Sequence, residues 1–309
     1  YLYSLPAALA GTAMNDWLPI LATVLGAATP LIYAGLGELV TEKAGVLNLG
    51  VEGMMLIGAV TAFAVASDSG SLAAGIAAGT GAGIAASALF ALLTLHALAN
   101  AMATGLALAL FGVGLSAFVG RAYISRVLDG VGPVELLPGL ALDPFVLGSL
   151  LLLAAVQFFL YHSRAGLVLR AVGESPTTAH ALGYPVRLIR WAAILFGGAC
   201  SGLAGTFLAV DYTPMWVEGL TAGRGWIALA LVVFATWKPW RVLAGAYLFG
   251  GVTILQFHGQ ALGLAIPPQF MGMLPYLATI VVLALISRRG TTLRANAPAS
   301  LGQTWHPGF

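Results

Sequence analysis

Long runs of apolar residues alternate with short polar segments along almost the whole chain. A membrane-spanning helix needs about 20 apolar residues, and fewer where a broken helix is shielded by protein. By this criterion the sequence predicts spans at residues 17–37, 49–67, 72–96, 99–120, 144–161, 191–210, 219–237, 241–257 and 270–287. The pattern therefore predicts an all-α fold, a polytopic membrane helical bundle of about eight to ten transmembrane helices, some of them discontinuous.

A short apolar stretch breaks this regularity in the second half of the chain. Within the span at 219–237, the uninterrupted apolar part runs only from Trp226 to Trp237. As a helix it would rise about 18 Å, which is too little for the roughly 30 Å hydrocarbon core of a bilayer. We therefore expect a broken or re-entrant element there, and we expect Pro30 and Pro275 to kink the spans that contain them.

The composition agrees with lipid as the solvent. Apolar residues make up 60% of the 309 residues and charged residues 8%, with a mean hydropathy of +0.95, whereas soluble domains carry roughly 25% charged residues. Many of the 40 glycines lie within apolar runs such as 75–83, where small residues let helices pack closely. The alternative is that these thin helices line a path and move against one another.

Several kinds of chemistry lack support in the sequence. No Gly-x-x-x-x-Gly-Lys-Ser/Thr stretch is present for binding ATP. The histidines are scattered and the cysteine is single, which favours neither a metal site nor a disulfide. Ser116 and Ser201 lie among glycines, which fits packed helices better than the nucleophile of an intramembrane protease. We therefore expect no catalytic residue, no metal site and no cofactor bound by this chain, and the net charge of +2 gives no sign of nucleic-acid binding.

Basic residues indicate how the chain is oriented. The polar loop at 162–190 holds four arginines, and short loops rich in Lys and Arg stay on the cytoplasmic side. Counting spans outward from this loop places ten of the thirteen basic residues inside, together with the C-terminal tail at 291–309. The same count puts the N-terminus outside. Met14 is a plausible natural start, so residues 1–13 are expected to be extraneous.

Ionisable residues gather in a first informative segment, at 37–55. It contains Glu38, Glu42, Lys43, Asn48 and Glu52. Charged groups at membrane depth are costly and face a cavity or a partner, so one interpretation is a discontinuous element that lines a translocation path. The other is an ordinary cytoplasmic loop followed by a capped helix. If the segment is helical, Asn48 and Glu52 lie on one face.

A second informative segment lies in the loop at 164–187. Ser175 followed by Pro176 is typical of an N-cap and the first position of a helix. Residues 177–182 would form a short helix, which Gly183 would end. A short helix held by two arms in a cytoplasmic loop suits the docking of another protein. The alternative is a surface loop that merely connects two spans.

Both segments resemble the membrane permease subunits of ABC importers in the branched-chain amino acid, ribose and nucleoside superfamily. The run at 42–55 is similar to the signature of the nucleoside and simple-sugar branch, and the run at 213–230 resembles that branch as well. The similarity covers nearly all of the chain and implies an ABC permease transmembrane domain at 14–290.

The resemblance also implies a cytoplasmic coupling helix that contacts the ATPase, within the coupling loop at 162–190. Glu174, Pro176, Ala179 and Gly183 match the family pattern Gly-Glu-Ser/Asn-Pro-x-x-Ala-x-x-x-Gly. The coupling element that the motif implies consists of Ala171, Val172, Gly173, Glu174, Ser175, Pro176, Thr177, Thr178, Ala179, His180, Ala181, Leu182, Gly183 and Tyr184.

Function and partners follow from the same resemblance. It implies the permease subunit of an ATP-driven importer for nucleosides, or for a related simple sugar or small polar solute, in the bacterial cytoplasmic (inner) membrane. A partner ABC ATPase subunit would bind ATP and Mg²⁺. The other implied partners are a second homologous permease in a heterodimer and an extracytoplasmic substrate-binding lipoprotein. The alternative is a stand-alone secondary transporter or channel, which would need buried acids, and the spans lack them apart from Glu52 and Glu38.

Solute contact is expected along the path and near an outer gate. The expected pathway residues are Asn48, Glu52, Thr213, Trp216, Glu218, Thr221 and Arg224. Asn48 offers a donor and an acceptor to a neutral polar ligand, and Trp216 offers a stacking face for a base. In the alternative interpretations, Trp216 is an interfacial anchor and Arg224 forms an ion pair with Glu218 or Asp211.

Overall fold

The computed structural model confirms an α-helical membrane bundle. It describes residues 5–132, 134–137, 140–261 and 296–306, and six helical positions between 270 and 284. In this part of the chain, 6 helices are long and apolar enough to cross a membrane. They are α1 (Leu5–Lys43), α2 (Val51–Ser69), α3 (Leu72–Ala91) with its π-helical end η1 (Leu92–His96), α4 (Ala101–Gly120) with η2 (Arg121–Tyr123), α5 (Pro144–His162), and α8 (Val186–Phe207) with η3 (Leu208–Tyr212).

Shorter elements complete the described fold. They are α6 (Arg164–Glu174), α7 (Pro176–Ala181), α9 (Arg224–Phe234), α10 (Pro239–Ala261), and an antiparallel pair of short strands, β1 (Val134–Leu137) and β2 (Leu140–Leu142). The strands are a local addition to the expected all-α fold. Most of the expected span at 270–287, including Pro275, lies outside the described residues.

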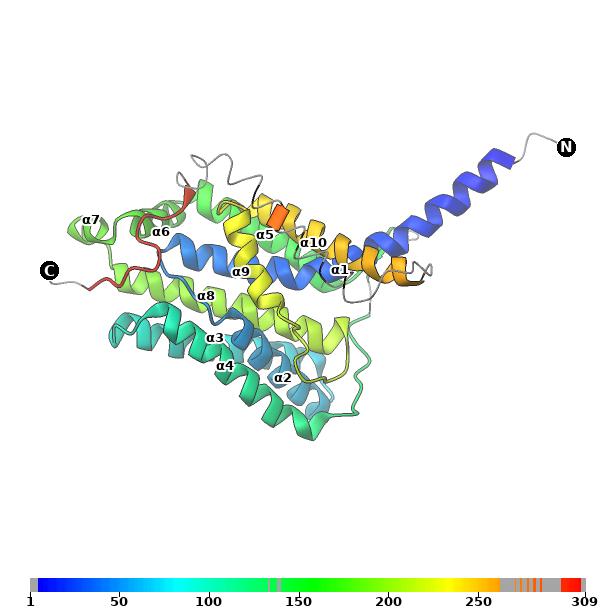
Figure 1. Ribbon diagram of the computed structural model, residues 1–309, viewed down its shortest axis with the longest axis horizontal. Helices are drawn as coiled ribbons and strands as arrows, with labels where there is room; N and C mark the ends of the chain where they lie inside the picture. Colours follow the sequence, from blue (N-terminus) through cyan, green and yellow to red (C-terminus); the bar gives the residue numbers. More distant parts are fainter. Residues whose placement is uncertain are drawn as a thin grey trace.

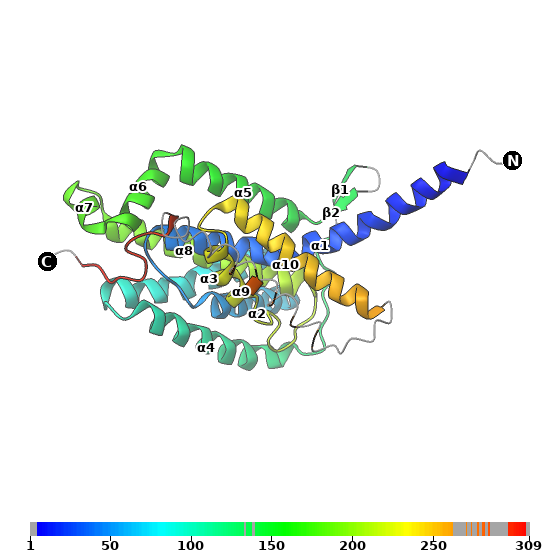
Figure 2. The ribbon, with the colours of Figure 1, turned by 45° about the horizontal axis from the view of Figure 1, so that its top comes forward.

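The bundle is elongated, with different elements at its two ends and on its two sides. In Figure 1, α6, α7 and the C-terminal residues gather at one end of the bundle, and the N-terminal part of α1 projects from the other. Figure 2 shows α4 and α5 on opposite flanks, with α1, α2, α3 and α8 between them. The flanking helices expose large apolar side chains such as Phe118 and Leu151, which suits a face against lipid.

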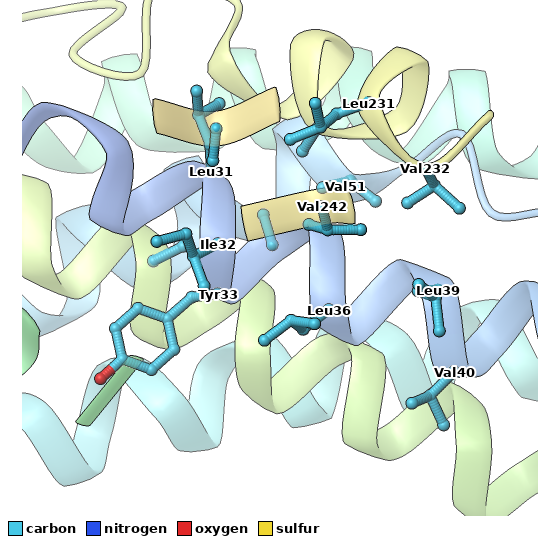
Figure 3. Close-up of a cluster of buried hydrophobic side chains, with 14 of the residues drawn as sticks. Leu31, Ile32, Tyr33, Leu36, Leu39, Val40, Val51, Leu231, Val232 and Val242 are labelled. Carbon is cyan, nitrogen blue, oxygen red and sulfur yellow. The ribbon is translucent and has the colours of Figure 1, made fainter. Parts of the chain in front are cut away.

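Helix α1 forms the centre of the main apolar cluster. Leu31, Ile32, Leu36 and Leu39 of α1 are fully buried and pack with residues of α9 and α10 such as Val232 (Figure 3). Helix α1 continues to Lys43, beyond the expected end at residue 37. Glu38 and Glu42 are therefore part of a buried helix rather than of a loop.

Glycines bring α2, α3 and α8 into direct backbone contact. A Cβ atom placed on Gly202 of α8 would lie 2.6 Å from the carbonyl oxygen of Gly79 and 3.0 Å from the Cα atom of Gly83, both in α3. A Cβ on Gly58 of α2 would lie 2.6 Å from the Cα atom of Gly202. The packing interpretation of the glycine-rich runs is therefore confirmed at this seam.

The close contact between α3 and α8 at Gly202 can be tested by substitution. Gly202→Ala should separate α3 from α8 and lower the stability by about 1–3 kcal/mol, the usual cost of overpacking. Gly81→Ala is the matched control, because a Cβ at Gly81 of α3 has nothing within 4 Å. Thermal unfolding of both variants in detergent measures the difference. Equal midpoints for the two variants would contradict the close seam.

A pair of carboxyl groups lies towards the end of the bundle that is opposite to α7. Asp143 caps α5 by accepting a hydrogen bond from the backbone N–H of Phe145 at 2.6 Å. Asp211, in η3, accepts one from the N–H of Val131 at 2.6 Å. Burial and the hydrogen bond to the Asp211 carboxyl raise the pKa of Asp143 to about 7. The Asp143 carboxyl therefore keeps its proton up to about pH 7.

This pair predicts a pH dependence of stability. A folded-state pKa above the ordinary value of 3.8 favours folding most below pH 4, and this contribution is lost as the pH rises to about 7. Asp143→Asn should therefore flatten the fall of the melting temperature between pH 4 and pH 7. If the melting temperatures of the variant and the wild type fall in parallel across that range, the raised pKa of Asp143 is refuted.

Candidate functional site

The chain is not helical between α1 and α2, and this break (residues 44–50) is buried inside the bundle. The backbone N–H of Asn48 donates to Glu38 Oε1 at 3.0 Å. The Asn48 side-chain oxygen accepts from the N–H of Gly50 at 2.9 Å. Buried backbone groups need hydrogen-bond partners inside the protein, and these bonds satisfy part of the break. The structure thus favours the discontinuous element over an ordinary loop.

The break corrects one expectation. Asn48 precedes α2, whereas Glu52 lies in its first turn, so the two side chains do not share a helix face. The Asn48 amide is also buried, and its Nδ2 donates to Met54 Sδ at 3.5 Å. In this conformation Asn48 shapes the break and has no free polar edge for a ligand.

Glu52 anchors the start of the short helix α9. Its Oε1 accepts hydrogen bonds from the Thr221 hydroxyl at 2.5 Å and the Gly223 N–H at 3.0 Å. Its Oε2 accepts from the Gly225 N–H at 2.6 Å. The first N–H groups of a helix have no partner within the helix and carry partial positive charge. A carboxylate that is only 6% exposed is therefore stabilised there, and both of its oxygens are occupied.

A second acid holds the other end of α9. The indole N–H of Trp237 donates to Glu42 Oε2, which joins the segment after α9 to α1. Thr236 and Trp237 have positive φ values of 50° and 53°, so the chain turns sharply there. Helix α9 has 11 residues, which confirms the expected broken element. Acids from α2 and α1 fix this short helix at its two ends.

Trp216, Glu218 and Thr213, which were also expected near the outer gate, do not lie at the start of α9. Trp216 is 4% exposed and packs with Val60 and Phe63, and a Cβ on Gly120 would collide with its ring. Its face is therefore not free for stacking in this conformation, nor does it lie at an open membrane surface. Glu218 is exposed, and Thr213 ends η3.

Arg224 lies where α9 begins. Its guanidinium group is 5.9 Å from the centre of the Tyr212 ring. It also donates to the carbonyls of Leu220 and Thr221, each at 3.4 Å. Of the seven expected pathway residues, the structure therefore brings Glu52, Thr221 and Arg224 together at the N-terminus of α9.

The short helix expected after Ser175 is present. The Ser175 hydroxyl accepts a hydrogen bond from the Thr178 N–H at 3.3 Å, Pro176 occupies the first turn, and Gly183 follows with a φ of 87°. The helix spans Pro176–Ala181, one residue earlier than expected. Leu182 is 72% exposed beyond its end. An exposed short helix at one end of the bundle is available to a partner protein (Figure 1).

Basic residues from three separate segments lie near one another at this end. They are Lys43 of α1, Arg170 of α6 and Lys238 after α9, and the acids Glu42 and Glu174 lie among them. Towards the opposite end, Arg126 pairs with Asp68 at 2.8 Å. The grouping agrees with the predicted division of basic residues between the two sides.

Sequence reasoning missed two polar residues at the α7 end. Arg190 of α8 is 2% exposed and Ser300 is 4% exposed, and an Arg190 N–H donates to the Ser300 hydroxyl at 3.2 Å. Arg190 was counted only as an orienting charge. It stands four residues after Val186 and three before Ala193, on one buried face of α8. That spacing was the available signal.

Comparison with known families identifies the chain. The profile of the family described as branched-chain amino acid transport system / permease component matches residues 20–285. The chain belongs to this permease family. A permease component of this kind works with a separate ATPase and a substrate-binding partner, and is not the catalytic subunit.

Relatives of this permease match over nearly full length. A putative glucose ABC transporter permease of Haloferax volcanii is 39% identical over 93% of this chain and 97% of its own. A nucleoside ABC transporter permease of Lactococcus lactis is 32% identical over 92% and 96%. A guanosine ABC transporter permease of Bacillus subtilis is 31% identical over 89% and 92%. No solved structure matches the chain significantly.

Buried acids are more numerous than expected, because the permease buries Glu42 as well as Glu38 and Glu52. A scarcity of buried acids therefore does not speak against a stand-alone transporter. These acids hold helix breaks, through Asn48, Trp237 and the start of α9. Family membership, rather than a lack of acids, therefore decides between the two functions.

The anchor of α9 makes a further prediction. Glu52→Gln keeps the shape but removes the charge that faces three donors, so we expect a loss of about 1–3 kcal/mol in stability. Asp129→Asn is the control, because Asp129 is an exposed carboxyl near the opposite end. Thermal unfolding and protease sensitivity of residues 221–238 report the effect. A Glu52→Gln variant as stable as Asp129→Asn would rule out the anchor.

Proposed function

We propose that this chain is the membrane permease subunit of an ATP-driven ABC importer that carries nucleosides, with simple sugars as the nearest alternative. The single observation that best supports import driven by a partner is the exposed, capped helix α7 at one end of the bundle. Relatives named for a nucleoside, guanosine and glucose support the solute class.

We also propose that α7 lies on the cytoplasmic side of the cytoplasmic membrane. A partner ATPase binds ATP and Mg²⁺ there, and this chain binds no cofactor. A second homologous permease completes a heterodimer, and an extracytoplasmic lipoprotein delivers the solute. The cluster of basic residues around Lys43 and Arg170 supports the side assignment.

Alternating access gives the mechanism. Closure of the ATPase dimer on ATP moves α7, and the bundle changes between conformations that open to opposite sides. Short helices and breaks are where such a bundle can rearrange. In this chain those points are the α1–α2 break and α9, held by Glu38, Glu42 and Glu52.

The solute path is proposed to pass beside the start of α9. Thr221 and Arg224 border it, with Thr213, Trp216 and Glu218 towards the outer mouth. Asn48 and Glu52 hold the flanking helices in the present conformation. They would contact the solute only after these bonds are exchanged in another conformation.

Reconstitution tests the function. The chain is placed in liposomes with its ATPase, second permease and receptor, and uptake of labelled nucleoside and glucose is followed with and without ATP. We expect ATP-dependent uptake that disappears when the ATPase is left out. Uptake by this chain alone, unaffected by ATP, would defeat the proposal.

A substitution tests the docking role of the α7 region. Glu174→Ala removes an exposed carboxylate just before α7, so folding should be unchanged while ATPase binding weakens about tenfold, or roughly 1.4 kcal/mol. Co-purification of the ATPase with this variant is compared with that of Asp129→Ala, an exposed acid near the opposite end. Equal recovery in both variants would remove the assigned role.

A further inference from the structure

The C-terminal segment (residues 296–306) lies against the α7 end of the bundle. In Figure 1 it passes beside the end of α1 and towards α7. The Lys43 ammonium group donates to the carbonyl of Asn296 at 2.7 Å, and the Gly302 N–H donates to the carbonyl of Gly45 at 3.2 Å. The segment is thus attached at two points to the last residue of α1 and the first part of the α1–α2 break.

Ser300 joins this segment to the helices on either side of α7. Its hydroxyl and its backbone N–H both donate to the carbonyl of Gly173, at 2.6 and 3.1 Å, near the end of α6. Arg190, near the start of α8, donates to the Ser300 hydroxyl at 3.2 Å and to the carbonyl of Ala44 at 3.1 Å. Four separate segments therefore meet at two buried side chains.

The meeting point has no spare room. Gly45 has a φ of 86°, and a Cβ atom there would collide with the Ser300 hydroxyl and lie 2.9 Å from Arg190. A Cβ on Gly173 would collide with the carbonyl of Lys43. The end of α6 and the α1–α2 break are therefore in direct backbone contact at this point, and a displacement of one acts on the other.

Trp305 extends the contact to α7 itself. Its ring lies 5.3 Å from the ring of His180 at an angle of 64°. It also packs against the cluster of Val172, Ala179 and Val186 on the buried side of α7. Aromatic pairs in this edge-to-face arrangement are attractive beyond their buried area. One segment thus touches α7 at Trp305 and the α1–α2 break at Ser300 and Gly302.

We propose that the C-terminal segment is a working part of the coupling element, which ties α7 to the α1–α2 break and passes the movement of α7 to α1 and α2. This inference rests on the proposed function, because it assumes that an ATPase moves α7. The break is held by Glu38 and Asn48, and Glu42 and Glu52 lead from it to α9. Movement at Trp305 therefore has a continuous route of contacts to both ends of α9.

The assembled transporter tests the proposal through the amount of solute carried per ATP hydrolysed. Trp305→Ala removes the contact with α7 and should lower uptake about tenfold, while ATPase co-purification and hydrolysis stay within about twofold of wild type. Trp305→Phe keeps an aromatic ring beside His180 and should restore uptake. Gln303→Ala is the control, because Gln303 is exposed and its side chain donates to the carbonyl of Ala299 within the same segment, at 3.3 Å.

Each outcome has one meaning. Uptake and hydrolysis that fall in parallel, or uptake that does not change, would overturn the proposal, and so would loss of the ATPase from Trp305→Ala. A wild-type assembly without ATP-dependent uptake defeats the proposed function instead. The two failures are therefore distinguishable in the same assay.

A second measurement covers the case in which Trp305→Ala does not fold. Spin labels on Gln303→Cys and Ala171→Cys mark the segment and the part of α6 that leads into α7, and both positions are exposed. Cys200, the single natural cysteine, is buried. The label distance should change by less than about 2 Å between nucleotide-free and ATP-bound assemblies, the scale of packed-helix shifts. A larger separation would show that the segment does not move with α7 and would overturn the proposal.

Discussion

Both carboxylate oxygens of Glu52 accept hydrogen bonds from the start of α9, a short helix that begins inside the bundle. A helix that stops inside a bundle leaves N–H and carbonyl groups without partners in the helix, and other parts of the protein must supply them. This chain meets the constraint with acids from the neighbouring helices α1 and α2. Glu38 holds the α1–α2 break and Glu42 holds Trp237 beyond α9.

The bundle combines a tightly packed group of helices, α2, α3 and α8, with a short helix, α9, that can change its contacts. Helices α2, α3 and α8 meet at glycines with almost no space between their backbones, so they behave as one packed unit. Helix α9 buries residues such as Val232 against α1, and hydrogen bonds to Glu52 and Glu42 hold its two ends. Hydrogen bonds of this kind can be exchanged for others at a moderate cost, whereas the glycine seam can only be opened by separating the helices.

The α7 end of the bundle, where we propose that a partner ATPase binds, is also connected to the interior. Helix α7 is exposed, but its buried side touches Trp305, and Ser300 joins the end of α6 to Arg190 and the α1–α2 break. A displacement of α7 therefore meets a connected set of contacts rather than a loose loop. In the proposed function, a separate ATPase subunit causes such a displacement, and these contacts carry it inward.

The sequence by itself determined the elements: spans such as 72–96 and 144–161, the shortness of α9, and the cap of α7 at Ser175 and Pro176. Hydropathy and capping act between near neighbours, so they can be read along the chain. Only the tertiary structure decided that Glu52 meets Gly223, 171 residues away, that Trp216 is buried, and that Arg190 meets Ser300. These contacts depend on how helices pack, because a buried charge selects whichever donors or acceptors the folded bundle brings to it.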